Sequence, residues 1–118
     1  MTENRLPDYL AHMAEAANHA LGFVEDMDKK SFLADKRTQQ AVVLNIVIIG
    51  EAATKLLKDY SDFLDRHPKV PWRSMKGMRN RIAHGYFDIN LDVVWDTVQT
   101  ALPELIASLV AVRKDAGE

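Results

Sequence analysis

The chain has 118 residues, no cysteine and a formal net charge of −2, and 47% of its residues are hydrophobic. This length and apolar content predict one folded unit, so we expect residues 1–118 to form a single domain. The absence of cysteine excludes a disulfide framework and a thiolate metal site, and it fits a reducing, cytoplasmic location.

The first predicted helix begins near Pro7, because proline is tolerated in an opening helical turn. It is expected to end in the polar stretch 25–30, and residues 1–5 lack the apolar core of a signal peptide. His12, Glu15 and His19 share one side of it, but no second cluster completes a metal site, and we expect none. Its apolar residues recur at helical spacing: Leu6, Leu10, Met13, Ala17, Leu21 and Val24.

A second, central helix is predicted to begin near Asp35 or Thr38 and to continue beyond Leu56. Its middle is apolar nearly all round, which predicts neighbours on several sides. The apolar run 41–50 is interrupted by Asn45 and has about half the length that spans a bilayer, so we expect no membrane insertion.

The second half of the chain carries further helix signals. Ser61 is expected to cap a short helix, and a longer one should run from about Trp72 to His84, with Gly85 as a left-handed cap. A last helical region follows Asp88 or Asn90, and Pro103 should kink it near residue 101. Amphipathic helices with short links predict an all-α fold, an antiparallel bundle of four to five helices.

Positive charge is concentrated in one segment of this acidic chain. Between Asp65 and Asp88 there is no acidic residue, and His84 lies among the basic side chains there. Such a segment predicts a local anion-binding face. It holds six of the 15 Lys and Arg residues: Arg66, Lys69, Arg73, Lys76, Arg79 and Arg81.

These residue types fit cleavage of RNA. A histidine such as His84 transfers protons near neutral pH, and the planar guanidinium of Arg79 matches a phosphate and stabilises the charge that grows on it. RNA supplies its own nucleophile, the 2′-hydroxyl, and the segment lacks the carboxylate clusters of magnesium-dependent nucleases. We therefore expect a site without metal or other cofactor.

The spacing of this pair raises a geometric question. Residues 79 and 84 differ by about 140° in direction on an ideal helix. Either His84 lies at a frayed end where Gly85 bends the chain, or a second protomer completes the site. Asn80 lies four residues before His84 on the same face, where its amide is placed to orient the imidazole.

The pattern Arg79-x-x-x-x-His84-x-Tyr86 resembles the signature of the HEPN superfamily, specifically HepT-like toxins encoded beside a minimal nucleotidyltransferase antitoxin. Further matching stretches are Ile49-Gly50-Glu51-Ala52, Pro71-Trp72-Arg73, Asn80 and Trp95. The resemblance implies a HEPN-like homodimer with a composite cleft, acting as a metal-independent endoribonuclease toxin. It also implies that Arg79 and His84 are the catalytic pair, that Asn80 supports them, and that the antitoxin neutralises the toxin by adding AMP to Tyr86.

Other polar residues have weaker assignments. Arg73 and Lys76 are candidate phosphate contacts, and Glu51 is expected to pair with Lys55 or with a motif arginine. Trp72 and Trp95 are expected to be core or interface anchors. The alternative function is a non-catalytic helical subunit that binds RNA, a nucleotide or a nucleotidyltransferase through the same face.

Overall fold

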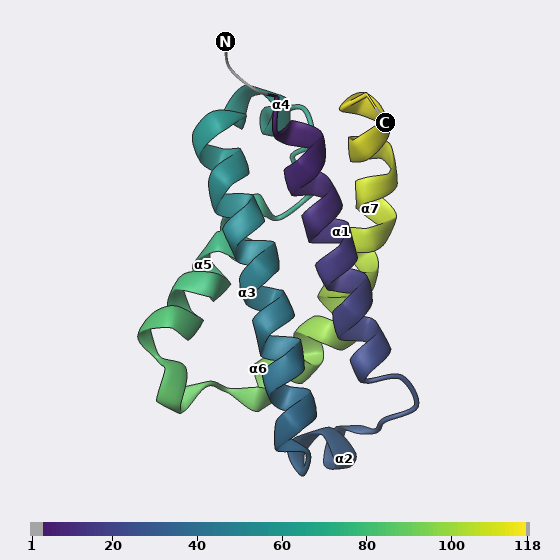
Figure 1. The fold of residues 1–118 in the computed structure, drawn as a ribbon, viewed down its shortest axis with the longest axis vertical. Helices are drawn as coiled ribbons and strands as arrows, with labels where there is room; N and C mark the ends of the chain where they lie inside the picture. The colour runs from purple at the N-terminus through teal and green to yellow at the C-terminus, as the bar shows by residue number, and fades with distance from the viewer. Residues whose placement is uncertain (1–3, 118) are drawn as a thin grey trace.

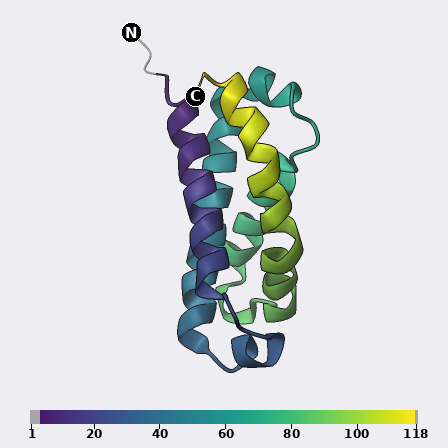
Figure 2. The ribbon, with the colours of Figure 1, turned by 90° about the vertical axis from the view of Figure 1, so that its right-hand side faces the viewer.

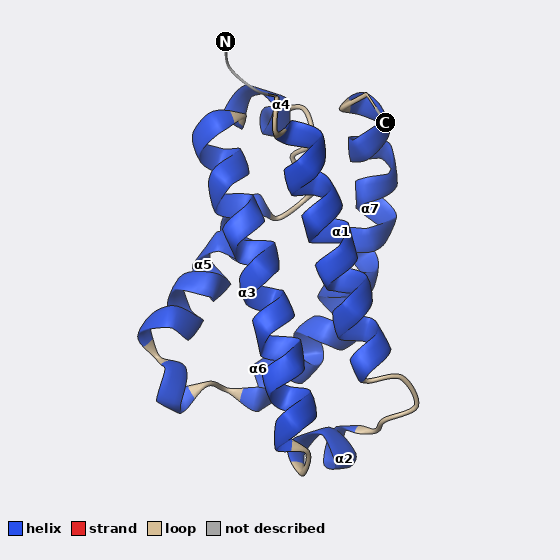
Figure 3. Ribbon diagram, viewed as in Figure 1, coloured by secondary structure: helices blue, strands red, loops and turns tan. Residues whose placement is uncertain are grey.

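The computed structural model describes residues 4–117, and within that range the secondary structure is helical without any strand (Figure 3). This confirms the predicted all-α fold. The α-helices are α1 (Leu6–Phe23), α2 (Lys29–Leu33), α3 (Lys36–Asp59), α4 (Ser61–Asp65), α5 (Trp72–His84), α6 (Leu91–Asp96) and α7 (Leu102–Asp115). A 3₁₀ turn, η1 (Tyr86–Asp88), and a π-helical turn, η2 (Thr97–Ala101), complete the elements.

The long helices form a bundle around α1 and α3. Helix α1 packs along both α3 and α7, and α5 packs against α3 (Figures 1 and 2). Leu10 and Met13 of α1 are fully buried, as are Val42 and Leu56 of α3, so one apolar core runs the length of the bundle. Trp72 is buried and Trp95 is packed against the same core, as expected for anchors.

Helix α3 begins where the sequence predicts, directly after Asp35. The Asp35 carboxylate accepts hydrogen bonds from the backbone N–H of Thr38 at 3.1 Å and from its hydroxyl at 2.8 Å. The prediction of neighbours on several sides is confirmed, because α3 packs against α1 and α5 and touches α2, α4 and α6. One face of α3 stays open, where Leu44 is 59% exposed and Ile48 37% exposed. The helix is long and apolar enough to cross a membrane, but its other face is buried in the bundle, as in core helices of soluble proteins.

Helix α2 lies in a region where the sequence shows no apolar stripe. Asp28 caps it by accepting the Ser31 N–H at 2.8 Å, and this hydrogen bond lowers the pKa of the Asp28 carboxyl. The one buried side chain of α2 is Phe32, with its ring centroid 5.3 Å from that of Trp95. At the surface, Lys29 Nζ lies 3.0 Å from Asp92 Oδ1. A single buried side chain produces no periodicity, which is why the pattern does not reveal this helix.

Two predicted details of the helix ends require correction, and a third is confirmed. Gly85 has φ −122° and ψ 37°, so it is not a left-handed cap. Ser61 is the first residue of α4 and makes no capping hydrogen bond, and Tyr60 precedes it. As predicted, the last helical region is capped by Asn90 and is interrupted near residue 101, by a π-helical turn before Pro103, whose ring nitrogen has no N–H to donate.

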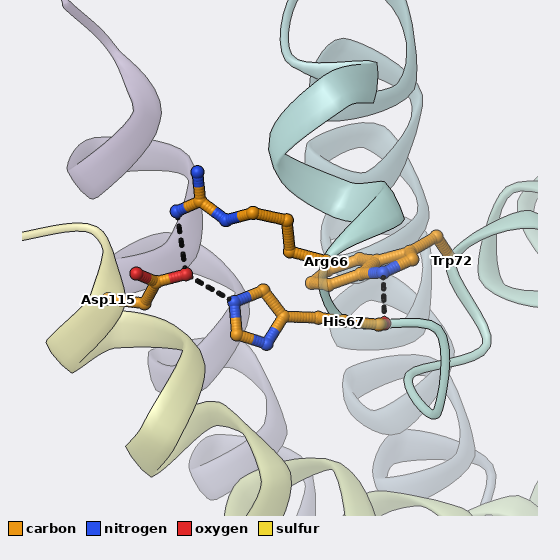
Figure 4. Close-up of polar contacts among 4 residues, drawn as sticks. All are labelled: Arg66, His67, Trp72 and Asp115. Carbon is orange, nitrogen blue, oxygen red and sulfur yellow. Dashed lines mark hydrogen bonds and ion pairs between the residues drawn. The ribbon is translucent and has the colours of Figure 1, made fainter.

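An ionic latch joins the end of α7 to the segment between α4 and α5. The Asp115 Oδ2 lies 2.7 Å from Arg66 Nη2 and 2.8 Å from His67 Nε2 (Figure 4). The indole N–H of Trp72 donates to the backbone oxygen of His67 at 3.1 Å. The latch therefore holds the segment between α4 and α5 against the end of α7, and the Trp72 hydrogen bond holds the start of α5 to the same segment.

The Asp115→Asn variant is expected to lower stability near pH 7 and to have no effect in strong acid. The hydrogen bonds from Arg66 and then from His67 lower the Asp115 pKa from its ordinary value of 3.8. Stabilisation by this carboxylate is thus present above about pH 3.8 and is lost as the pH falls through the lowered folded-state pKa. The urea midpoint of unfolding, measured at pH 7 and in strong acid, gives the stability of each protein. Glu104→Gln on the same helix is the control. Equal urea midpoints for Asp115→Asn and the unmodified protein at pH 7 would show that the latch adds nothing.

Candidate functional site

Helix α5 presents the predicted basic residues along its solvent side. Arg73, Lys76, Asn80 and His84 follow one another at intervals of three or four residues, so they form one stripe. Arg73, Lys76 and His84 are exposed and Asn80 is half-buried. The stripe therefore offers cations and a titratable ring to the solvent from a single helix face.

Arg79 points away from this stripe toward α3. Its Nη2 donates to the Thr54 hydroxyl at 3.2 Å, and that hydroxyl donates to the backbone oxygen of Gly50 at 2.8 Å. The Arg79 Nε lies 2.9 Å from Glu51 Oε1. This nitrogen is buried and its N–H is not directed at an acceptor, so the contact with Glu51 is an ion pair rather than a hydrogen bond.

These contacts decide between the two partners predicted for Glu51. The carboxylate pairs with Arg79 and not with Lys55. The Glu51 side chain is 51% exposed, so its charge remains largely hydrated and avoids the cost of deep burial. Thr54 belongs to the same cluster and was not predicted, because a lone threonine in an apolar helix carries no sequence signal.

Gly50 makes the close approach of α3 and α5 possible. A Cβ at this position would overlap the Arg79 Cβ and lie 2.8 Å from the backbone oxygen of Met75. The absence of a side chain at residue 50 thus allows Arg79 to reach Glu51 and Thr54. Packing of α5 against α3 therefore explains why a glycine stands in the stretch 49–52.

His84 is the last residue of α5 and stands apart from Arg79. The end of α5 diverges from α3 (Figure 1), and among residues 4–117 no hydrogen bond or ion pair involves the His84 side chain. The expected hydrogen bond from Asn80 to His84 is likewise not formed. Within residues 4–117, Arg79 and His84 thus share no hydrogen bond, and His84 lies at the helix end where the backbone of Gly85 leaves the helix.

Two exposed aromatic rings follow the histidine in η1. Tyr86 is 61% exposed and Phe87 is 95% exposed, and their rings meet edge to face with centroids 5.4 Å apart. The phenol of Tyr86 is therefore open to another molecule. Phe87 was not singled out from the sequence, since exposure of one aromatic residue cannot be deduced from its neighbours.

No group of three or more histidine and acidic side chains within residues 4–117 is arranged to hold a metal ion. On α1, His19 Nε2 and Glu15 Oε1 lie 4.0 Å apart at the surface. The chemistry that the described residues offer is thus that of proton transfer by an imidazole and of phosphate binding by guanidinium and ammonium groups.

Comparison with known proteins identifies relatives over nearly the whole chain. "Putative RNase MJ0127" of Methanocaldococcus jannaschii is 36% identical over 107 residues, covering 91% of this chain and 86% of that protein. "Probable ribonuclease HepT" of Thermococcus cleftensis is 37% identical over 107 residues, covering 91% of this chain and 94% of that protein. No solved structure matches the chain.

The family described as "Ribonuclease HepT-like" matches residues 13–112, which include α3, α5 and the turn with Tyr86. This match confirms the resemblance drawn from the motif and its surrounding stretches. Because the family model covers most of the chain, the chain belongs to the HepT-like ribonuclease family.

Proposed function

We propose that the protein is a metal-independent endoribonuclease that cuts RNA by attack of the 2′-hydroxyl. The observation that carries this proposal is the exposed His84 at the end of a stripe of phosphate-binding side chains, in a chain of a ribonuclease family. Arg73 and Lys76 precede His84 on the stripe and bind the RNA backbone. The segment between Asp65 and Asp88 contains no carboxylate that would hold magnesium.

The proposed reaction moves two protons and exchanges one bond. A His84 imidazole takes the proton of the 2′-hydroxyl, and the 2′-oxygen forms a bond to phosphorus while the bond from phosphorus to the 5′-oxygen breaks. A protonated imidazole returns a proton to the leaving 5′-oxygen. Arg79 stabilises the charge on the non-bridging oxygens. The products are a 2′,3′-cyclic phosphate and a 5′-hydroxyl.

This scheme requires a homodimer with a composite cleft. One protomer supplies one His84, which does not contact Arg79, whereas two protomers related by a two-fold axis supply an acid and a base. The exposed Leu44 and Ile48 of α3 lie on the same side as Glu51, the partner of Arg79. They provide the apolar surface that a homodimer buries beside the site.

The test of this function is cleavage of single-stranded RNA by the purified protein in EDTA. The expected result is fragments that end in a 2′,3′-cyclic phosphate, identified by mass, and no cleavage of DNA of the same sequence. Loss of activity in EDTA with recovery on adding Mg²⁺ would contradict the metal-independent mechanism. Tight RNA binding without any cleavage would favour the alternative, a non-catalytic RNA-binding subunit.

We further propose that the protein acts as the toxin of a toxin–antitoxin pair and that a nucleotidyltransferase antitoxin modifies Tyr86. The proposal rests on the 61% exposure of Tyr86 and on its place two residues after His84. The Tyr86 oxygen attacks the α-phosphorus of ATP and pyrophosphate leaves. The added phosphate brings negative charge next to the stripe, where it repels the RNA backbone.

Incubation with such an enzyme and ATP is expected to add one AMP to Tyr86 and to suppress RNA cleavage. Peptide mass mapping locates the modification, and Tyr86→Phe is expected to take up none. Tyr60 is an internal control, because its hydroxyl accepts the backbone N–H of Arg5 at 2.9 Å and is half-buried. An unmodified Tyr86 under these conditions would indicate inhibition by complex formation instead.

A further inference from the structure

A hollow of about 320 Å³ lies between the C-terminal half of α5, η1 and the start of α6. The elements that line it, the end of α5, η1 and α6, lie away from α4 and from the end of α7 (Figure 1). Its floor is formed by apolar side chains of α5, of α6 and of the loop between η1 and α6, namely Met78, Ile82, Ile89 and Val94, and Val93 of α6 is 46% exposed. The volume suits a ligand the size of a purine nucleoside rather than a single ion.

Two opposite charges line this hollow without pairing. Arg81 and Asp88 both contribute to its wall, yet neither forms an ion pair or side-chain hydrogen bond with any residue between 4 and 117. Both side chains are exposed. A ligand that fits between them therefore needs a flat apolar body, an acceptor edge for the guanidinium and a donor edge for the carboxylate.

The hollow adjoins the candidate cleavage site along the chain. Gly85 lines it and directly follows His84, so their Cα atoms lie about 3.8 Å apart. The Gly85 N–H donates to the Arg81 backbone oxygen at 2.8 Å. This hydrogen bond holds Gly85, which lines the hollow, at the end of α5 next to His84. An RNA strand with a phosphate at His84 thus has a neighbouring base within reach of the hollow.

We propose that this hollow binds an unpaired guanine of the RNA substrate next to the scissile phosphate. The inference rests on the proposed RNA cleavage and adds to it a base preference. Guanine offers O6 and N7 to the fork of Arg81, and its N1–H and amino group to the two oxygens of Asp88. Its ring lies on the apolar floor, as splayed bases do in proteins that bind single-stranded RNA.

The test is RNA binding by the His84→Ala protein, which leaves the substrate intact. Fluorescence anisotropy compares labelled oligouridine strands that carry one central G, C, A or U. The G strand is expected to bind roughly tenfold more tightly than the others. Asp88→Asn, and Val93→Phe, which fills the mouth of the hollow, are each expected to abolish the difference. Val110→Phe is the matched control, because Val110 is a similarly exposed valine on α7 and the preference should persist.

Equal affinity for the four strands would overturn the guanine pocket, as would a guanine preference that survives both pocket variants. A Val93→Phe protein that loses its dimeric state with unchanged base preference would instead assign the hollow to a protein contact. Circular dichroism confirms that each variant is folded. Wild-type cleavage of RNA is measured separately, so failure of the nuclease function and failure of the pocket give different results.

Discussion

The His84→Ala protein is expected to cut RNA between 10² and 10⁴ times more slowly than the unmodified protein, roughly the contribution of a general acid or base. Because the His84 side chain is exposed and has no hydrogen-bond or ion-pair partner among the described residues, its removal should leave the fold unchanged. RNA binding should be nearly unchanged as well, since Arg73 and Lys76 remain on the stripe. Initial cleavage rates and the thermal midpoint of both proteins check this result.

A matched control is available on another helix. His12 lies exposed on α1, so His12→Ala removes a solvent-facing imidazole without touching the stripe. It is expected to cleave at the wild-type rate. Wild-type activity in the His84→Ala protein would remove His84 from the chemistry, and equal losses in both variants would point to a copurifying nuclease.

Gly50→Ala is expected to destabilise the protein and to reduce cleavage together. The new methyl group would overlap the Arg79 Cβ and approach the Met75 backbone oxygen, and backbone cannot move aside by a rotamer change. Overpacking of this kind costs about 1–3 kcal/mol or more, against a gain of up to about 1 kcal/mol from replacing a helical glycine. A net loss lowers the melting temperature by roughly 4 °C per kcal/mol.

The loss of activity follows from the same displacement. When α5 moves off α3, Arg79 leaves Glu51 and Thr54, so cleavage at a temperature where the variant is folded should still be reduced. Gly22→Ala provides the comparison, because nothing lies within 4 Å of a Cβ at Gly22 and the change should raise stability slightly. A Gly50→Ala protein as stable as Gly22→Ala would contradict the tight crossing of α3 and α5.

The sequence predicts α5 well because local signals mark both its ends. Pro71 precedes the first residue and Gly85 follows the last, and between them the apolar positions of Trp72 and Ile82 recur at helical spacing. Helix α2 lacks such a stripe, since Phe32 is its one buried side chain. Local periodicity thus predicts the long helices and misses a short helix that is held by contacts distant in the sequence, such as that of Phe32 with Trp95.

The candidate site was predictable in its members but not in its contacts. The residue types and the acid-free segment point to Arg79 and His84, and the helical angle between them already predicts that they face different ways. The choice of Glu51 between Lys55 and Arg79 depends on where α5 crosses α3. That crossing is allowed by the missing side chain of Gly50. The sequence places Gly50 in a stretch that resembles the family, but it does not show which helix packs against this glycine.

Because Arg79 and His84 are not joined within one chain, the rate of RNA cleavage is expected to depend steeply on protein concentration. In the proposed composite cleft the active species is the pair of chains, and at concentrations below the dimer dissociation constant its abundance falls with the square of the protein concentration. Trace synthesis of such a ribonuclease would do little damage, and cleavage would rise steeply once the chain accumulates. A ribonuclease built this way is active only above a threshold concentration that its own dimerisation sets.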